Sequence, residues 1–350
     1  MRLLYVLLAV SFMTSCVNDK KEKSSDSFEI DIEVVYSDSV SIRAIQPIDA
    51  NGVWFAGNNG KVGFIDGKTP KLATIRYGDS LLSFRAIAKT DKAVFVLSIS
   101  NPGVLYKIGF DGVEGTSMEE VYYEEGSNVF YDAMKFWNNK EGIAMGDPTE
   151  DCLSILITRD GGNNWKKLSC ESLPKTEEGE AAFAASNSNI AVFEDKAWIV
   201  SGGKRSRVFY SPDKGQTWEV FDTPIIEGDA MTGIYSVDFF DAETGIIFGG
   251  DWNAKENNFA NKAITKDGGK TWKLLSEGAG PGYRSPVKFV PNGNGKEIVA
   301  VGSLGISYSK DQGESWQEIS KESFFAIEFV NDTLAFASGN NRIARLIFRK

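Results

Sequence analysis

The side chains that could act together chemically are arginines and carboxylates that fall at equivalent points of a repeated strand pattern. With two aromatic neighbours, the set is Arg43, Arg85, Asp132, Asp147, Asp251, Trp252, Tyr283 and Arg284. Guanidinium groups bind carboxylates through paired hydrogen bonds, and aromatic rings add apolar contact area. We expect this set to bind a carboxylate or a peptide segment. If the protein is a hydrolase, Asp132 or Asp147 is the candidate acid. The alternative is that these charges satisfy one another and cap strand ends.

Some chemistry is excluded by composition. Histidine is absent from the 350 residues, which removes Ser-His-Asp and Cys-His catalysis and imidazole metal ligands. The three cysteines are too few for a zinc site built from thiolates alone. We therefore expect no metal and no cofactor. A formal net charge of -10 also disfavours nucleic acid and anionic lipid headgroups as partners.

A motif of the form Ser/Thr-x-Asp-x-Gly-x-x-Trp, called the Asp box, indicates how these residues are positioned. Its four copies carry Asp160 and Trp165, Asp213 and Trp218, Asp267 and Trp272, and Asp311 and Trp316. At a β-hairpin tip, Asp bonds the backbone of its own turn, Gly takes a positive φ, and Trp begins the return strand. The Asp residues are 53, 54 and 44 residues apart, the spacing of propeller blades built from short strands.

The alternation of apolar residues around the boxes predicts an all-β fold, a seven-bladed β-propeller with Asp-box hairpins. Because the two early blades have no box, six and eight blades are the alternatives. Blades one to three open at 41–57, 83–99 and 130–147, blades four to six near Ser188, Tyr235 and Ser285, and a seventh unit spans 323–348. The seventh unit has three strands, and the strand-like segment 28–37 can supply the fourth. Strands from both chain ends would then close the ring and leave no open sheet edge.

The predicted topology places the site. In a propeller, the box hairpin lies on the face opposite the start of the first strand and the end of the second. Alignment of the blades puts Arg43, Arg85 and Asp132 at first-strand starts, with Arg284 one residue off. It puts Asp147 and Asp251 at second-strand ends. We therefore expect the functional surface at the central-channel mouth, opposite the boxes.

The N-terminus is typical of an exported protein. Residues 1–15 read as a lipoprotein-type signal peptide, with Arg2 before an apolar run that is too short to span a membrane. The sequence MTSC resembles a lipobox, so Cys16 is the expected lipidation site and 16–27 a polar tether to one propeller domain over 28–350. The protein would be a membrane-anchored lipoprotein of the bacterial cell envelope, periplasmic or surface-facing. The alternative is an ordinary cleaved signal peptide with Cys16 incidental.

The other two cysteines, Cys152 and Cys170, flank the first box hairpin at similar distances from Gly161. They could face each other across the strands. A disulfide is plausible in an exported protein, and two separate buried thiols are the alternative.

Four stretches carry a resemblance to a known family: 142–165, 179–190, 233–252 and 281–291. On these the chain resembles a bacterial family of exported Asp-box (BNR-like) repeat propellers related to the photosystem II stability and assembly factor. The resemblance spans residues 40–348. It implies a seven-bladed propeller that acts as a protein-binding or assembly scaffold, with a protein or peptide partner in the cell envelope.

An enzymatic alternative comes from sialidases, which also combine Asp boxes with a propeller. Residues 283–286, YRSP, look like their Phe/Tyr-Arg-x-Pro signature, although in sialidases that signature precedes the boxes and here three boxes come first. Arg43, Arg85 and Arg284 could form a carboxylate clamp above an acid. The alternative function is thus a carbohydrate-active hydrolase, a sialidase-like glycosidase with a glycan ligand.

Overall fold

The computed structural model describes residues 28–112 and 114–349. The expected signal peptide (1–15), Cys16 and the tether (16–27) lie outside the described residues. Within the described part of the chain, no helix has the length and apolar character needed to cross a membrane.

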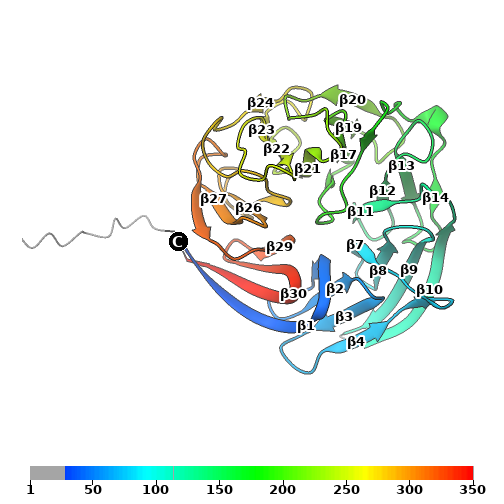
Figure 1. The fold of residues 1–350 in the computed structure, drawn as a ribbon. Helices are drawn as coiled ribbons and strands as arrows, with labels where there is room; N and C mark the ends of the chain where they lie inside the picture. The colour runs from blue at the N-terminus through cyan, green and yellow to red at the C-terminus, as the bar shows by residue number, and fades with distance from the viewer. Residues whose placement is uncertain (1–27, 113, 350) are drawn as a thin grey trace, which may run out of the picture.

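These residues form antiparallel sheets arranged in a ring around a central axis (Figure 1). The first sheet has the order β29 (Ala326–Asn331), β30 (Leu334–Arg349), β1 (Glu29–Pro47), β2 (Val53–Gly57), β3 (Lys61–Ile65) and β4 (Lys71–Thr74). The second contains β7 (Phe84–Lys89), β8 (Ala93–Ser98), β9 (Gly103–Asp111) and β10 (Glu114–Glu124). The third contains β11 (Tyr131–Phe136), β12 (Gly142–Gly146), β13 (Ser154–Thr158) and β14 (Lys166–Lys167).

The fourth sheet contains β16 (Ile190–Phe193), β17 (Lys196–Val200), β19 (Arg207–Ser211) and β20 (Glu219–Asp222). The fifth has the order β15 (Glu180–Ala181), β18 (Gly202–Gly203), β21 (Thr232–Phe239), β22 (Gly245–Asp251), β23 (Lys262–Thr265) and β24 (Lys273–Leu274). The sixth contains β25 (Val287–Phe289), β26 (Ile298–Gly302), β27 (Gly305–Ser309) and β28 (Gln317–Ser320). A short ribbon, β5 (Arg76–Tyr77) with β6 (Ser80–Leu81), and one 3-10 turn, η1 (Cys170–Ser172), complete the elements.

The all-β propeller class predicted from the sequence is confirmed, but the prediction of seven blades is wrong. The described residues form six sheets of four or six strands. The segments expected to open the first blade and close the last share the six-stranded sheet, because β1 runs without a break through both. Its first half pairs with β30 and its second half with β2. This pairing places the blue and red ends of the described chain side by side (Figure 1).

The core lies between neighbouring sheets rather than inside one of them. Both faces of each sheet are covered, so strands such as Ile143–Met145 in β12 are apolar without alternation and fully buried. Aromatic rings stack across these junctions: Trp198 lies 3.6 Å from Phe239, and Phe28 lies 3.7 Å from Tyr308, centroid to centroid. Packing between sheets therefore holds the ring together.

The four motif hairpins (158–165, 211–218, 265–272 and 309–316) explain why their sequence recurs. In the second, Asp213 Oδ1 accepts hydrogen bonds from the main-chain N–H groups of Gln216 and Thr217 at 3.0 and 2.8 Å. The Ser211 hydroxyl also donates to it, and accepts in turn from the N–H of Gly215, which has φ of 85°. Burial opposes ionisation of Asp213, but these hydrogen bonds lower its pKa below the usual 3.8. The motif therefore closes a tight turn.

Candidate functional site

The residues expected at first-strand starts lie at irregularities of the innermost strands. The register shifts at Arg43 in β1, Arg85 in β7, Asp132 in β11 and Tyr235 in β21. A bulge takes one side chain out of the strand's alternation and re-aims it. The repeated sequence therefore predicted a structural equivalence, and its residues surround the channel.

A segment of the chain itself, the plug (residues 182–189), occupies the space these residues face. Arg43 Nη1 donates to the main-chain oxygen of Ala185 at 3.0 Å, and Arg85 Nη1 donates to that of Ala184 at 2.9 Å. The ring of Phe183 stacks on Tyr235, with centroids 3.8 Å apart. The plug thus contacts strands from three different sheets through these residues alone.

Two more plug residues extend these contacts. The Asn187 side chain donates to the Ile87 oxygen at 2.8 Å and accepts from the N–H of Met134 at 2.9 Å. The hydroxyls of Ser186 and Ser285 lie 3.2 Å apart. The plug is therefore fixed as part of the fold. Its carbonyl oxygens accept hydrogen bonds from Arg43 and Arg85, which the sequence predicted to bind a ligand.

The two arginines are unusual because no carboxylate forms an ion pair with either among the described residues. Burial, and then the charge of Arg85, lower the pKa of Arg43 to about 10. The Arg43 guanidinium also lies 4.0 Å above the ring of Phe325. Main-chain carbonyls and one aromatic face thus replace the expected carboxylate.

Asp132 is fully buried, and neither of its carboxylate oxygens has a hydrogen-bond partner in the structure. Burial and then the charge of Asp147 raise its pKa well above the usual 3.8, with partial compensation from Arg85. The protonated form is favoured. In this conformation Asp132 cannot touch a substrate.

Asp147, directly after β12, is the predicted residue that lines a pocket. Burial raises its pKa to about 6, opposed by the N–H of Ala182, which donates to Oδ1 at 2.7 Å. It lines a pocket of about 760 Å³, here the acidic pocket. Its acidic lining residues are Asp147, Glu150, Asp151, Glu177, Glu178 and Glu180, and no described lysine or arginine lines it. The polar uncharged residues of the wall include Ser100, Asn101, Ser127 and Asn128.

Two of these carboxylates are compensated. Glu180 is buried against Arg207, whose Nε donates to it at 3.0 Å, and Asp151 pairs with Lys175 at 2.6 Å. No ion pair of Asp147, Glu150, Glu177 or Glu178 is found in the described part of the chain. The pocket therefore presents net negative charge. It lies by the β12–β13 loop, at the opposite end of the strands from the motif hairpin that joins β13 and β14.

A strap (residues 168–182) forms one wall of this pocket and is fastened to the β12–β13 loop. Cys170 is bonded to Cys152, with Cα atoms 5.5 Å apart. The N–H of Thr176 donates to the Asp151 oxygen at 2.9 Å. With the link between Ala182 and Asp147, the strap is held at three points along its length.

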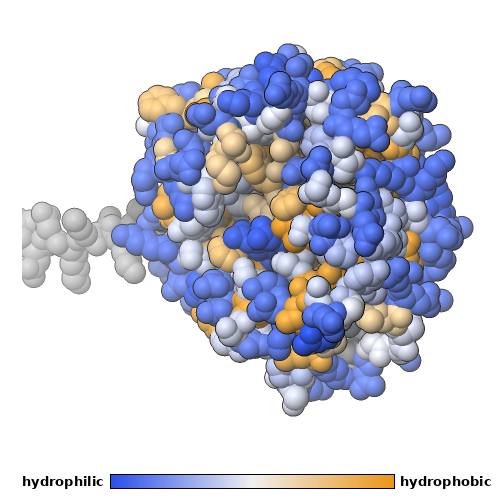
Figure 2. Space-filling model, turned by 45° about the vertical axis from the view of Figure 1, so that its right-hand side comes forward, coloured by the Kyte–Doolittle hydropathy of each residue, from blue (hydrophilic) through white to orange (hydrophobic). Residues whose placement is uncertain are grey.

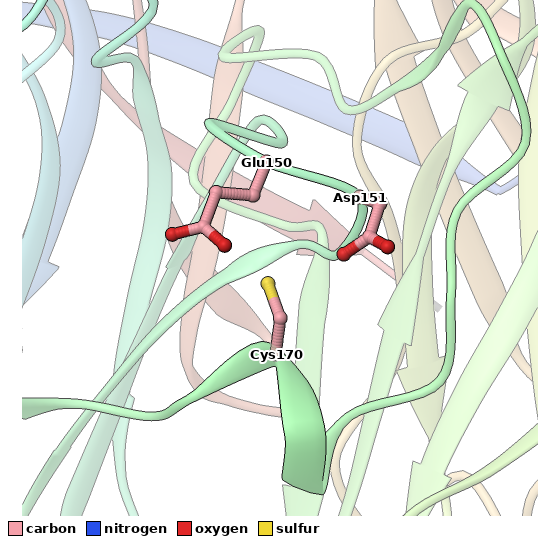
Figure 3. A group of neighbouring side chains, drawn as sticks. All are labelled: Glu150, Asp151 and Cys170. Carbon is pink, nitrogen blue, oxygen red and sulfur yellow. The ribbon is translucent and has the colours of Figure 1, made fainter.

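Near the disulfide, Cys170 Sγ and one carboxylate oxygen each of Glu150 and Asp151 lie within 4.8 Å of one another (Figure 3). The spacing would suit a metal ion. However, the sulfur is in a disulfide rather than a thiolate, and Asp151 already pairs with Lys175. We assign no metal to this group.

The remaining predicted residues do not join the pocket. Arg284 is buried, and its guanidinium donates to the Tyr283 oxygen and to Ser307 Oγ, both at 3.0 Å. Tyr283 is buried edge-on to Trp252, with centroids 5.4 Å apart. Asp251 accepts from the N–H of Asn253 at 2.7 Å. These residues stabilise the fold beside the plug.

Sequence reasoning missed a network of charges from four innermost strands. Glu328 pairs with Lys135 at 3.1 Å and with Lys288 at 3.3 Å, and Lys288 lies 3.9 Å from Asp238. The two lysines lower the pKa of Glu328 against the effect of burial. The blade alignment could have revealed this network, because each of its members lies three residues after an aligned first-strand start. These starts are Asp132, Tyr235, Ser285 and Phe325.

Comparison with known proteins gives structural likeness only. No family model and no curated protein matches the chain. Among solved structures, YCF48 bound to D1 peptide is 17% identical, with 93% of this chain and 98% of that chain covered and a TM-score of 0.65. The chain has a β-propeller fold. YCF48 from Cyanidioschyzon merolae is 15% identical (91% and 98% covered, TM-score 0.61), and a virginiamycin B lyase from Staphylococcus aureus is 10% identical (92% and 99%, TM-score 0.63). At such identities the resemblance to the Asp-box family stays a prediction.

Proposed function

We propose that this propeller is a protein-binding scaffold of the bacterial cell envelope, and that its acidic pocket binds a lysine- or arginine-rich segment of the partner. The observation that carries the proposal is the pocket of about 760 Å³ with four carboxylates that form no ion pair among the described residues. Its volume falls in the range of ligand sites, and its charge attracts cations. Export and a lipid anchor at Cys16 belong to the proposal on the N-terminal sequence alone.

The proposed ligand has the opposite charge from the carboxylate that Arg43 and Arg85 predicted. The reason is the plug, whose carbonyl oxygens already accept from both guanidinium groups. Hydrophilic residues cover most of the surface in Figure 2, with apolar residues visible between them, mainly toward the middle of the view. A surface of this kind favours polar, reversible contacts over a permanent apolar interface. That a chain of the same fold is described as bound to a peptide also supports a peptide ligand.

One observation favours the sialidase-like alternative. The pKa of about 6 for Asp147 is in the range that a general acid needs near neutral pH. Its nearest predicted partner, Asp132, is fully buried, so a second carboxylate for a glycosidase has to come from the pocket wall. Hydrolysis of aryl glycosides, including a sialoside, by the purified protein but not by Asp147→Asn is the result that would replace the scaffold with an enzyme.

Binding can be tested with a fluorescent lysine-rich peptide and its glutamate counterpart, followed by anisotropy at two salt concentrations. The double variant Glu177→Gln, Glu178→Gln removes two exposed charges from the strap, and Asp66→Asn, Asp79→Asn removes two charges elsewhere, one half-buried and one exposed. We expect the strap variant to bind the lysine peptide about tenfold more weakly, and the control to bind it normally. Equal affinity for both peptides would reject the acidic pocket as the site.

A further inference from the structure

The junctions between sheets are not all filled in the same way. The motif tryptophans pack toward the preceding sheet: Trp165 lies 6.3 Å from Phe95 of β8, and Trp316 lies 5.7 Å from Phe248 of β22, centroid to centroid. Trp218 and Trp272 join the buried clusters at the two junctions between these. The sheet of β7–β10 carries no motif hairpin, so its junction with β1–β4 receives no such ring.

A groove of about 390 Å³ lies at this junction, between the outermost strands β4 and β10. The apolar residues that line this β4–β10 groove are Trp54, Val62, Leu72, Ile75, Ile108 and Met118. Leu72 and Met118 are 46% and 53% exposed, so the groove presents apolar surface to solvent. Lys71 and Glu114 pair across the groove at 2.8 Å. The groove is large enough for a bulky side chain. At the other junctions a motif tryptophan provides such a side chain.

An unused hydrogen-bond donor belongs to the same groove. Trp54 is 5% exposed, and its indole N–H has no acceptor in the structure. Among the motif tryptophans, Trp272 and Trp316 each donate to a glycine carbonyl of their own hairpin at 2.9 Å, whereas the Trp165 indole N–H also has no acceptor. A buried N–H without a partner is costly, and this one is shielded from the groove, so an occupant could reach it only if the Trp54 ring moved.

The charge of Glu120 and the open edge of β10 indicate which kind of segment the groove could bind. Glu120 of β10 is exposed and forms no ion pair among the described residues. It lies close enough to Tyr106, a member of the core cluster at this junction, to add to the effect of burial in raising the pKa of that phenol. Strand β10 is 11 residues long and pairs only with β9, so its outer edge is open within the described chain. An extended segment can pair with such an edge.

We propose that the β4–β10 groove binds an extended segment of a partner protein that inserts one large apolar side chain between Leu72 and Met118 and places a lysine or arginine beside Glu120. The groove lies on the outer strands of the ring and shares no lining residue with the acidic pocket, so this site does not depend on the proposed function.

The probe is the capped pentapeptide Thr-Lys-Phe-Lys-Thr, titrated into the ¹⁵N-labelled protein. The readout is the indole N–H resonance of Trp54, assigned by its loss in Trp54→Phe. We expect a saturable shift, an affinity about tenfold lower in Met118→Glu, and an unchanged affinity in Val34→Glu, a substitution at a similarly exposed strand residue. Leu72→Gln, which adds no charge, should also weaken binding. Peptides with Ser in place of Phe, or Glu in place of both Lys residues, should bind more weakly.

Several results would overturn the proposal. One is the absence of any shift of the Trp54 indole resonance at millimolar peptide. Another is that Met118→Glu and Leu72→Gln both bind the peptide as tightly as the parent protein does. Equal binding of the Glu-flanked peptide would remove the role of Glu120. A concentration-dependent dimer that Met118→Glu dissociates would make a second copy of this chain the occupant, and Met118-dependent binding to phosphatidylcholine vesicles would make it a lipid surface.

Discussion

Arg43 donates a hydrogen bond of 3.0 Å to the main-chain oxygen of Ala185, 142 residues further along the chain. The bond joins the first sheet to the plug, and Arg85 makes the matching bond to Ala184. Burying a guanidinium without a carboxylate is unfavourable unless its hydrogen bonds are satisfied. The plug supplies one acceptor to each arginine, although Arg43 Nε has no partner, so the arginines hold the plug instead of forming an open ligand site.

Replacing Arg43 with Ala should therefore loosen the plug. A hydrogen bond from a charged group contributes about 1.5–3 kcal/mol, so amide hydrogen exchange at 183–187 should accelerate by about tenfold or more. Mass spectrometry of exchange in the native protein measures this. Arg76→Ala is the matched control, because Arg76 is exposed and makes one long bond of 3.4 Å. Unchanged exchange at the plug would show that packing alone holds it.

Asp147 should make the protein less stable as pH rises. Its pKa is about 6 in the folded chain against the usual 3.8, so between these values the native state keeps a proton that the unfolded state has released. Stability is then greatest below the unfolded value and falls as pH rises toward 6. Asp147→Asn should raise the free energy of unfolding by about 1–2 kcal/mol at pH 8 and have little effect at pH 4. Urea titrations at both pH values test the sign, and an equal effect at both would contradict it.

Below about pH 6, protonation of Asp147 should also weaken binding of the lysine-rich peptide. Affinity measured from pH 5 to pH 8 should increase across the titration of this group. In Asp147→Asn the affinity should change less with pH over that interval, since one carboxylate no longer titrates there. A pH profile identical to that of the parent protein would show that Asp147 does not contact the peptide.

The propeller fold could be predicted from the sequence because each copy of the repeated motif has the same structural role. Each motif Asp, such as Asp213, is the acceptor of its own turn, and its spacing therefore reports blade length. The blade count was not accessible in the same way. Segments 28–37 and 41–57 differ in pattern, yet both contribute to β1, and only hydrogen-bond pairing shows a single six-stranded sheet.

The candidate site was accessible only in part. Alignment found the bulge residues Arg43, Arg85 and Asp132, because equivalent positions recur once per blade. It could not reveal the plug, since most of residues 182–189 precede the aligned start of blade four at Ser188. Glu177 and Glu178 were missed for the same reason. Their role depends on a cross-link and on main-chain contacts that fix the strap beside Asp147.

Asp213→Ala should destabilise the fold by about 1–3 kcal/mol, because several donors of the turn lose their acceptor. Asp79→Ala, at an exposed turn residue, should change stability little. The hydrogen bonds also depress the pKa of Asp213, so its contribution is present above the unfolded value of 3.8 and is lost as pH falls through the folded value. Urea unfolding at neutral pH compares the variants. Equal stability would mean that the box Trp and Gly, and not Asp, fix the hairpin.

The disulfide offers a test of how the acidic pocket is built. Cys152 and Cys170 are 18 residues apart, and cross-linking a loop of this size contributes about 3 kcal/mol by restricting the unfolded chain. Cys152→Ser, Cys170→Ser should lose stability by that order and should also bind the lysine-rich peptide more weakly, because Glu177 and Glu178 lie on the strap between Cys170 and Ala182. Reduction with a dithiol should reproduce both effects in the parent protein and neither in the variant. If stability falls while affinity is unchanged, then Asp147 and the Asp151–Lys175 pair suffice to position the strap, and the cross-link serves the fold alone.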